Sequence, residues 1–113
     1  MQREEKGLRF VLLALAVAIS TAQAQEPRAI IGPMDFSCGK WINTPKDTSE
    51  YFQVRYWVLG YLSGNNMQSS VDFLRGRDAD GLTVWIDNYC RRNPLHAITR
   101  AMVELVKELK AGR

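Results

Sequence analysis

The sequence predicts an all-α protein: a small three- to four-helix bundle with orthogonal or antiparallel packing and one disulfide. Three observations indicate this class. Apolar residues recur with a helical period in residues 82–90 and again in residues 95–109. If residues 51–64 form a helix, that helix is apolar on almost every side, so other elements must cover it on more than one face. No stretch shows the strict alternation of a half-buried strand.

Residues 1–24 have the three parts of a secretory signal peptide. Three cations lie near the start, ten apolar residues run from Phe10 to Ile19, and Ala22-Gln23-Ala24 matches a small-residue cleavage site. The apolar run is shorter than the ~20 residues that span a membrane. We therefore expect an exported, periplasmic protein with no membrane span after cleavage.

The chain that follows is long enough for one domain. Residues 25–35 contain two prolines and are predicted to be a flexible, extended lead-in, and residues 36–113 are predicted to form a single helical domain. The formal charge is +3, but three of the 15 cations and two of the 12 acids lie in residues 1–24, which leaves about +2. This balance, without a basic stripe, does not indicate a nucleic-acid partner.

Cys38 and Cys90 predict one disulfide, because an even pair in a short exported chain meets an oxidising compartment. The alternative is a pair of buried free thiols. Closing a loop of roughly fifty residues stabilises a fold by about 4 kcal/mol in the chain-entropy model. Neither cysteine belongs to a zinc, haem or redox motif, so we expect no metal and no cofactor.

The segment before the central helix is predicted to be short and tightly turned. Residues 36–42, which carry Cys38 and Trp41, form a short helix or turn pinned by the disulfide. Residues 43–47 form a turn around a proline. Thr48 or Ser49 then provides the N-cap of the central helix.

The central helix, residues 51–64, carries two apolar stripes. The first consists of Tyr51, Val54, Trp57, Val58, Tyr61 and Leu62, and the second of Phe52, Tyr56 and Leu59. The second stripe, together with Trp57, is the predicted protein-binding surface. The alternative is that residues 36–42 or 67–74 cover the second stripe within the monomer.

Gly60 and Gly64 lie four residues apart in this helix, where each costs about 1 kcal/mol relative to alanine. Such a cost predicts a packing role, with another backbone or the Trp85 ring in close approach. The alternative is that Gly64 begins the end of the helix.

The later elements follow from their spacing. Residues 67–74 suit another helical turn or two, and residues 75–81 form a polar connection that resembles the start of a calcium loop but lacks its final glutamate. A helix from Leu82 turns Cys90 toward the core, and Asn93-Pro94 opens a last helix that includes Leu95. The predicted core and packing residues are Trp41, Val54, Val58, Gly60, Tyr61, Leu62, Gly64, Trp85, Ile86, Tyr89, Ile98, Met102 and Leu105.

No catalytic constellation is visible in the sequence. His96 is the only histidine and has no nucleophile beside it, and the aspartates of residues 72–87 are scattered. The three tryptophans, in a core this small, indicate packing more than a ligand pocket. We therefore expect a non-enzymatic domain that binds another protein.

Four features occur together in the mature sequence: Cys38 near Trp41, residues 57–64 (WVLGYLSG), Tyr89-Cys90, and Asn93-Pro94 before the last helix. In these features the chain resembles the HdeA/HdeB family of periplasmic acid-stress chaperones. The resemblance implies a homodimer that opens in acid and holds unfolded clients. Protonation of ten carboxylates would raise the mature charge from about +2 to about +12, and self-repulsion would loosen the packing.

The Gly-Tyr-x-x-Gly pattern at residues 60–64 and the Asn-Pro start of the last helix are also similar to the Tai-type immunity proteins. That resemblance implies a small periplasmic binder that neutralises a secreted amidase. A structural periplasmic helical protein is a further alternative.

Overall fold

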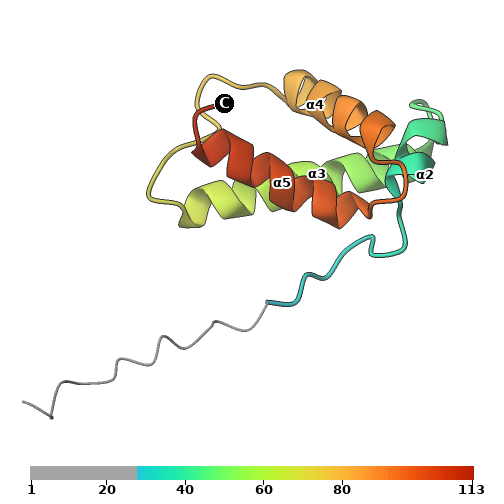
Figure 1. Cartoon of the computed structure of the whole chain (residues 1–113), viewed down its shortest axis with the longest axis horizontal. Coiled ribbons are helices and arrows are strands. Elements are labelled where there is room, and N and C mark those ends of the chain that lie inside the picture. Colours follow the sequence, from blue (N-terminus) through green and yellow to red (C-terminus); the bar gives the residue numbers. More distant parts are fainter. Residues whose placement is uncertain (1–27) are drawn as a thin grey trace, which may run out of the picture.

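The computed structural model describes residues 28–113. The predicted signal peptide, residues 1–24, lies outside this range. Four helices follow one another in the described part: α2 (Cys38–Asn43), α3 (Ser49–Gln68), α4 (Ala79–Arg92) and α5 (Ile98–Lys110). In Figure 1, α3 and α5 run side by side, α4 lies along α5, and α2 closes one end of the bundle. The predicted all-α bundle is confirmed over these residues.

A disulfide and main-chain hydrogen bonds anchor α2. Cys38 and Cys90 form the predicted disulfide, and both are fully buried. The Cys38 N–H donates to the His96 carbonyl at 2.8 Å, and the Ile98 N–H donates to the Phe36 carbonyl at 2.8 Å. The start of α2 is thereby tied to α4 by sulfur and to the α4–α5 connection by backbone.

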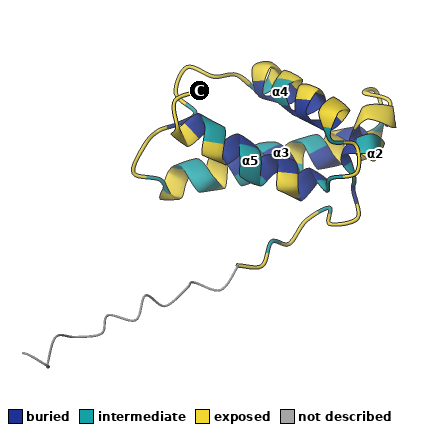
Figure 2. Ribbon diagram, viewed as in Figure 1, coloured by how far each residue is buried: buried dark blue, intermediate teal, exposed yellow. Residues whose placement is uncertain are grey.

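The central helix α3 begins where its cap predicts. Thr48 is the N-cap, and its hydroxyl accepts a hydrogen bond from the Tyr51 N–H at 3.3 Å. The helix runs on to Gln68 and buries one stripe at helical spacing, consisting of Tyr51, Val54, Val58 and Leu62. Figure 2 shows this pattern along the whole bundle, with buried faces turned inward and exposed faces outward.

Most of the predicted core is buried. The buried members are Trp41, Val54, Val58, Leu62, Ile86, Tyr89, Ile98, Met102 and Leu105. Tyr61 and Trp85 are half-buried and pack against this cluster. Phe36, Phe73 and Leu109 add further buried surface.

The predicted packing role of Gly60 and Gly64 is wrong. Both glycines are exposed, and a Cβ built on either one meets no atom within 4 Å. The alternative, that Gly64 begins the end of the helix, is also wrong because α3 continues to Gln68. The glycines lie on the face of α3 that the bundle leaves open.

The predicted start of the last helix is wrong. α5 begins at Ile98, and Leu95 is 95% exposed. Pro94 lies in the connection, where its carbonyl accepts a hydrogen bond from the Gly39 N–H at 2.8 Å. This pairing with α2 holds the connection in a non-helical path.

The α4 helix begins at Ala79, three residues before the predicted start at Leu82. Asp78 is its N-cap, and the carboxylate accepts a hydrogen bond from the Gly81 N–H at 2.7 Å. The last three residues of the predicted polar connection, 79–81, are therefore the first turn of α4.

Replacing Gly60 or Gly64 by alanine is expected to raise the free energy of unfolding by about 1 kcal/mol each. Both positions are helical and have open space for a methyl group. Urea denaturation of the single variants measures the change. Gly76→Ala is the matched control and should destabilise, because Gly76 has a φ of 74°. Destabilisation by either α3 substitution would mean that a close neighbour covers that face.

Candidate functional site

Two aromatic side chains stand on the open side of α3. Phe52 is 42% exposed and Tyr56 is 66% exposed. They lie four residues apart, and their rings stack with centroids 6.4 Å apart. The Tyr51 ring meets Phe52 edge-on at 5.8 Å, so the buried stripe supports the exposed pair.

A groove of about 430 Å³ runs between this part of α3 and α4. The residues that line it are Lys46, Tyr51, Phe52, Arg55, Asp80, Thr83 and Val84. Val84 contributes a further exposed apolar side chain from α4. We call Phe52, Tyr56, Val84 and this groove the α3–α4 face.

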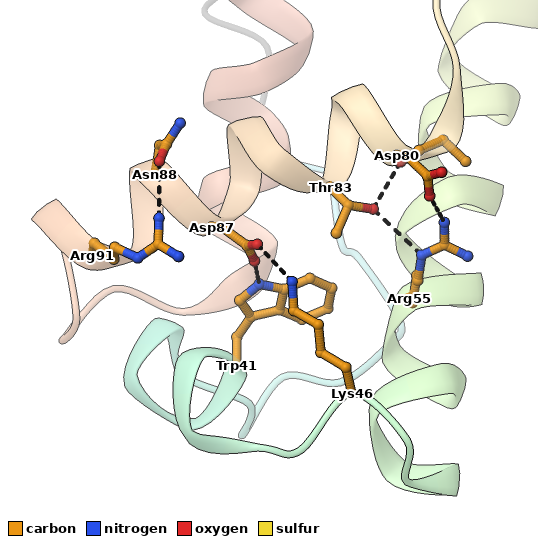
Figure 3. Close-up of polar contacts among 9 residues, drawn as sticks. Trp41, Lys46, Arg55, Asp80, Thr83, Asp87, Asn88 and Arg91 are labelled. Atoms are coloured by element: carbon orange, nitrogen blue, oxygen red, sulfur yellow. Dashed lines mark hydrogen bonds and ion pairs between the residues drawn. The ribbon is translucent and has the colours of Figure 1, made fainter.

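Arg55 holds the two helices together across the groove. Its Nη2 lies 3.0 Å from Asp80 Oδ1, and its Nε donates to Thr83 Oγ1 at 3.4 Å (Figure 3). The Arg55 side chain is only 18% exposed, whereas Asp80 is almost fully exposed. The guanidinium is therefore fixed in the wall of the groove.

A second polar cluster centres on Asp87, which is buried in α4. Trp41 Nε1 donates to Asp87 Oδ1 at 2.7 Å, and Lys46 Nζ lies 3.0 Å from Asp87 Oδ2 (Figure 3). Both carboxylate oxygens are thus satisfied, as a buried charge requires. The cluster joins α2, the turn before α3, and α4.

The Asp87 contact changes the titration of Lys46. Its hydrogen bond and then its charge raise the pKa of Lys46 above the usual 10.5. A folded-state pKa above the unfolded one means that the stabilisation is complete below pH 10.5 and is lost as pH rises through the raised pKa. Solvent screens the pair, because the Lys46 side chain is mostly exposed.

In the sequence, Asp87 is one of several scattered aspartates. The signal that identifies it is its position three residues before Cys90, on nearly the same side of the helix. A residue so close to a buried cysteine is itself expected to be covered. Its partners Trp41 and Lys46 could not be named from local sequence.

The four predicted binding residues separate into two groups. Phe52 and Tyr56 lie together and exposed, and neither residues 36–42 nor residues 67–74 bury them. Leu59 is half-buried against the core. Trp57 is also half-buried, and its Nε1 donates to the Ile31 carbonyl at 3.1 Å, so the segment before α2 covers part of it.

His96 has a structural contact. Its Nδ1 lies 2.8 Å from the Tyr89 hydroxyl, and the Tyr89 ring stacks on Trp85 with centroids 5.2 Å apart.

Within residues 28–113, no three His, Cys, Asp or Glu side chains are placed to hold a metal ion. No helix in the same part of the chain is long and apolar enough to cross a bilayer.

Comparisons with protein-family models, with curated proteins and with solved structures found no match.

Replacing Asp87 by alanine is expected to lower the free energy of unfolding by about 2 to 3 kcal/mol, because the buried Trp41 indole N–H loses its acceptor. Lys46→Ala should cost less, about 1 kcal/mol, because the Trp41 hydrogen bond to Asp87 Oδ1 remains and only the Oδ2 atom loses its partner. Asp87→Asn keeps an oxygen for Trp41 and should cost less than Asp87→Ala. Urea denaturation at pH 7 gives all three values. Equal losses for Lys46→Ala and Asp87→Ala would contradict this description of the cluster.

Proposed function

We propose that this protein is a non-catalytic protein-binding domain whose partner docks on the α3–α4 face. One observation carries the proposal: Phe52 and Tyr56 remain exposed and stacked beside a closed, disulfide-tied core. Adjoining exposed aromatic side chains are typical of protein interfaces, where they supply much of the binding energy. Arg55 in the wall of the groove adds a residue type that is enriched at such anchors.

The first candidate is a periplasmic stress chaperone of the HdeA type. The ion pairs between Arg55 and Asp80 and between Lys46 and Asp87 join α3 and the turn before it to α4, and the self-repulsion of a chain that carries excess positive charge in acid would oppose these contacts. The disulfide persists in acid and limits the expansion. Acid would then loosen α3 from α4 and enlarge the apolar surface offered to unfolded clients.

The segment after α3 contains a further acid-sensitive contact. Hydrogen bonds from Asn66 and then Arg75 hold the pKa of Asp72 below the usual 3.8. A lowered folded-state pKa means that this contribution to stability is complete above pH 3.8 and is lost as pH falls through the lowered value. The Asn66 side chain also accepts the Phe73 N–H at 2.9 Å, so the acid-sensitive contact adjoins the core.

The second candidate is a Tai-like immunity protein that inhibits one secreted effector enzyme. The fixed geometry of the face favours it, because Arg55 is already held by Asp80 and Thr83 while Phe52 and Tyr56 are stacked. A surface arranged before binding loses little conformational entropy in a complex with a folded partner. Such a partner would bind at neutral pH.

Phe52→Asp is expected to reduce suppression of client aggregation at pH 2 to 3 by about tenfold or more, because it removes an aromatic anchor. Light scattering of an acid-denatured, unrelated client protein measures the effect, and size-exclusion chromatography across pH gives the oligomeric state. Leu95→Asp is the matched control, since Leu95 is exposed in the α4–α5 connection, outside the face.

If the Phe52→Asp variant suppresses client aggregation as fully as the unmodified protein, the α3–α4 face has no role in client binding. No suppression by the unmodified protein, together with a tight neutral-pH complex with one amidase that Phe52→Asp weakens, would favour the immunity candidate. If Phe52→Asp weakens neither aggregation suppression nor an amidase complex, the proposed binding surface is wrong.

A further inference from the structure

Residues 31–33, before α2, pass over Trp57 and contact it through the main chain. The Trp57 indole N–H donates to the Ile31 carbonyl at 3.1 Å. The Ile31 side chain is 94% exposed and takes no part in the contact. On α3, the Trp57 ring stacks on the Tyr61 ring with centroids 5.4 Å apart, which fixes the orientation of Trp57. We call Ile31-Gly32-Pro33 the strap.

The contact leaves no room for a side chain at position 32, so only glycine fits there. A Cβ built on Gly32 would overlap the Trp57 ring. Gly32 is not among the glycines with positive φ, which within the described residues are Gly76 and Gly112. Its backbone is therefore open to other residues, and only the close approach to the ring selects glycine.

The strap covers Trp57 without filling the space beneath it. A hollow of about 230 Å³ remains between the strap and α3, lined by Gly32, Pro33, Gln53, Val54 and Trp57. Around the strap, Ile30 is half-buried, whereas Ile31 and Met34 are exposed. Little apolar area is buried by the contact, so a competing segment can displace the strap.

The surface beside Trp57 leads to the α3–α4 face. Tyr56 precedes Trp57 and lies about 100° away around the helix. Gly60 falls between them on the helical wheel, and the space above it is empty. An extended chain that contacts Trp57 can therefore pass over Gly60 toward Tyr56, because no side chain occupies the space above Gly60.

We propose that Trp57 is a docking site for an extended polypeptide segment that offers a free carbonyl beside a glycine, and that the strap occupies this site in the free protein. The inference rests on the proposed function and names its partner as an unfolded client. Folded proteins pair nearly all of their buried main-chain groups, whereas an unfolded chain presents free carbonyls next to glycine. Recognition through the main chain tolerates many client sequences. The strap and a client cannot bind Trp57 at the same time.

Gly32→Ala in the mature protein tests this site. Hydrogen exchange of the Trp57 indole N–H, followed by NMR at neutral pH, is expected to speed up at least tenfold, because the methyl group forces the strap from the ring. Ile31→Ala is the matched control and should exchange like the unmodified protein, since only its carbonyl is used. Trp57→Phe assigns the indole signal.

The probe for docking is a peptide with the sequence of residues 29–34, Ala-Ile-Ile-Gly-Pro-Met. It should shift the Trp57 indole signal of Gly32→Ala and leave the unmodified protein unchanged at the same concentration. The same peptide with alanine in place of glycine should shift neither. Unchanged indole exchange in Gly32→Ala would overturn the strap, and faster exchange without peptide binding would overturn the docking site.

Client assays separate this inference from the proposed function. Gly32→Ala should suppress aggregation at a higher pH than the unmodified protein, because its docking site is already free. If Phe52→Asp abolishes the suppression of aggregation and Gly32→Ala does not change it, the α3–α4 face is supported and the Trp57 site is rejected. If Phe52→Asp leaves the suppression intact and Gly32→Ala extends it to higher pH, the face is rejected and the Trp57 site is supported.

Discussion

The bond between Cys38 and Cys90 is the constraint on which the remaining arrangement depends. It joins α2 to α4, while the Cys38 N–H pairs with the His96 carbonyl in the connection to α5. α2 has only six residues and could not hold this position by its own helical stability. Once it is fixed, Trp41 packs on Tyr51 with centroids 4.9 Å apart and donates to Asp87. That contact places the first turn of α3.

The other helices cover α3 on one side only. α2 meets the bundle at one end, and α5 packs along α3 from the other side of the core. No further helix within residues 28–113 is left to cover Phe52 and Tyr56. A small domain gains stability by burying aromatic side chains, so leaving two of them stacked in solvent favours an interface. The polar contacts of Arg55 and Asp87 keep that face in a defined shape.

Local patterns in the sequence were sufficient where local interactions decide the structure. The N-cap at Thr48, the buried stripe from Tyr51 to Leu62 and the helical class all follow from spacing and capping chemistry. The disulfide followed from the number of cysteines and the expected compartment.

Contacts between distant segments account for the features that spacing could not predict. Pro94 suits a helix start, but its carbonyl is taken by the Gly39 N–H, and the helix begins later. The Gly60 and Gly64 pair looks the same in sequence whether its face is packed or open. Asp87 depends on Trp41, which is 46 residues away, and the partial cover of Trp57 depends on Ile31. The sequence therefore indicated Phe52 and Tyr56 of the α3–α4 face, whereas it indicated neither the groove beside them nor the strap over Trp57.

Residue-resolved hydroxyl-radical footprinting, applied to the protein and to a Cys38→Ala/Cys90→Ala variant, tests the central claim most directly. The claim predicts that Phe52 and Tyr56 are labelled in the disulfide-bonded protein while Tyr51 is protected, and that Tyr51 becomes labelled when the disulfide is absent. Protection of Tyr56 in the disulfide-bonded monomer, or protection of Tyr51 that is unchanged without the disulfide, would contradict it.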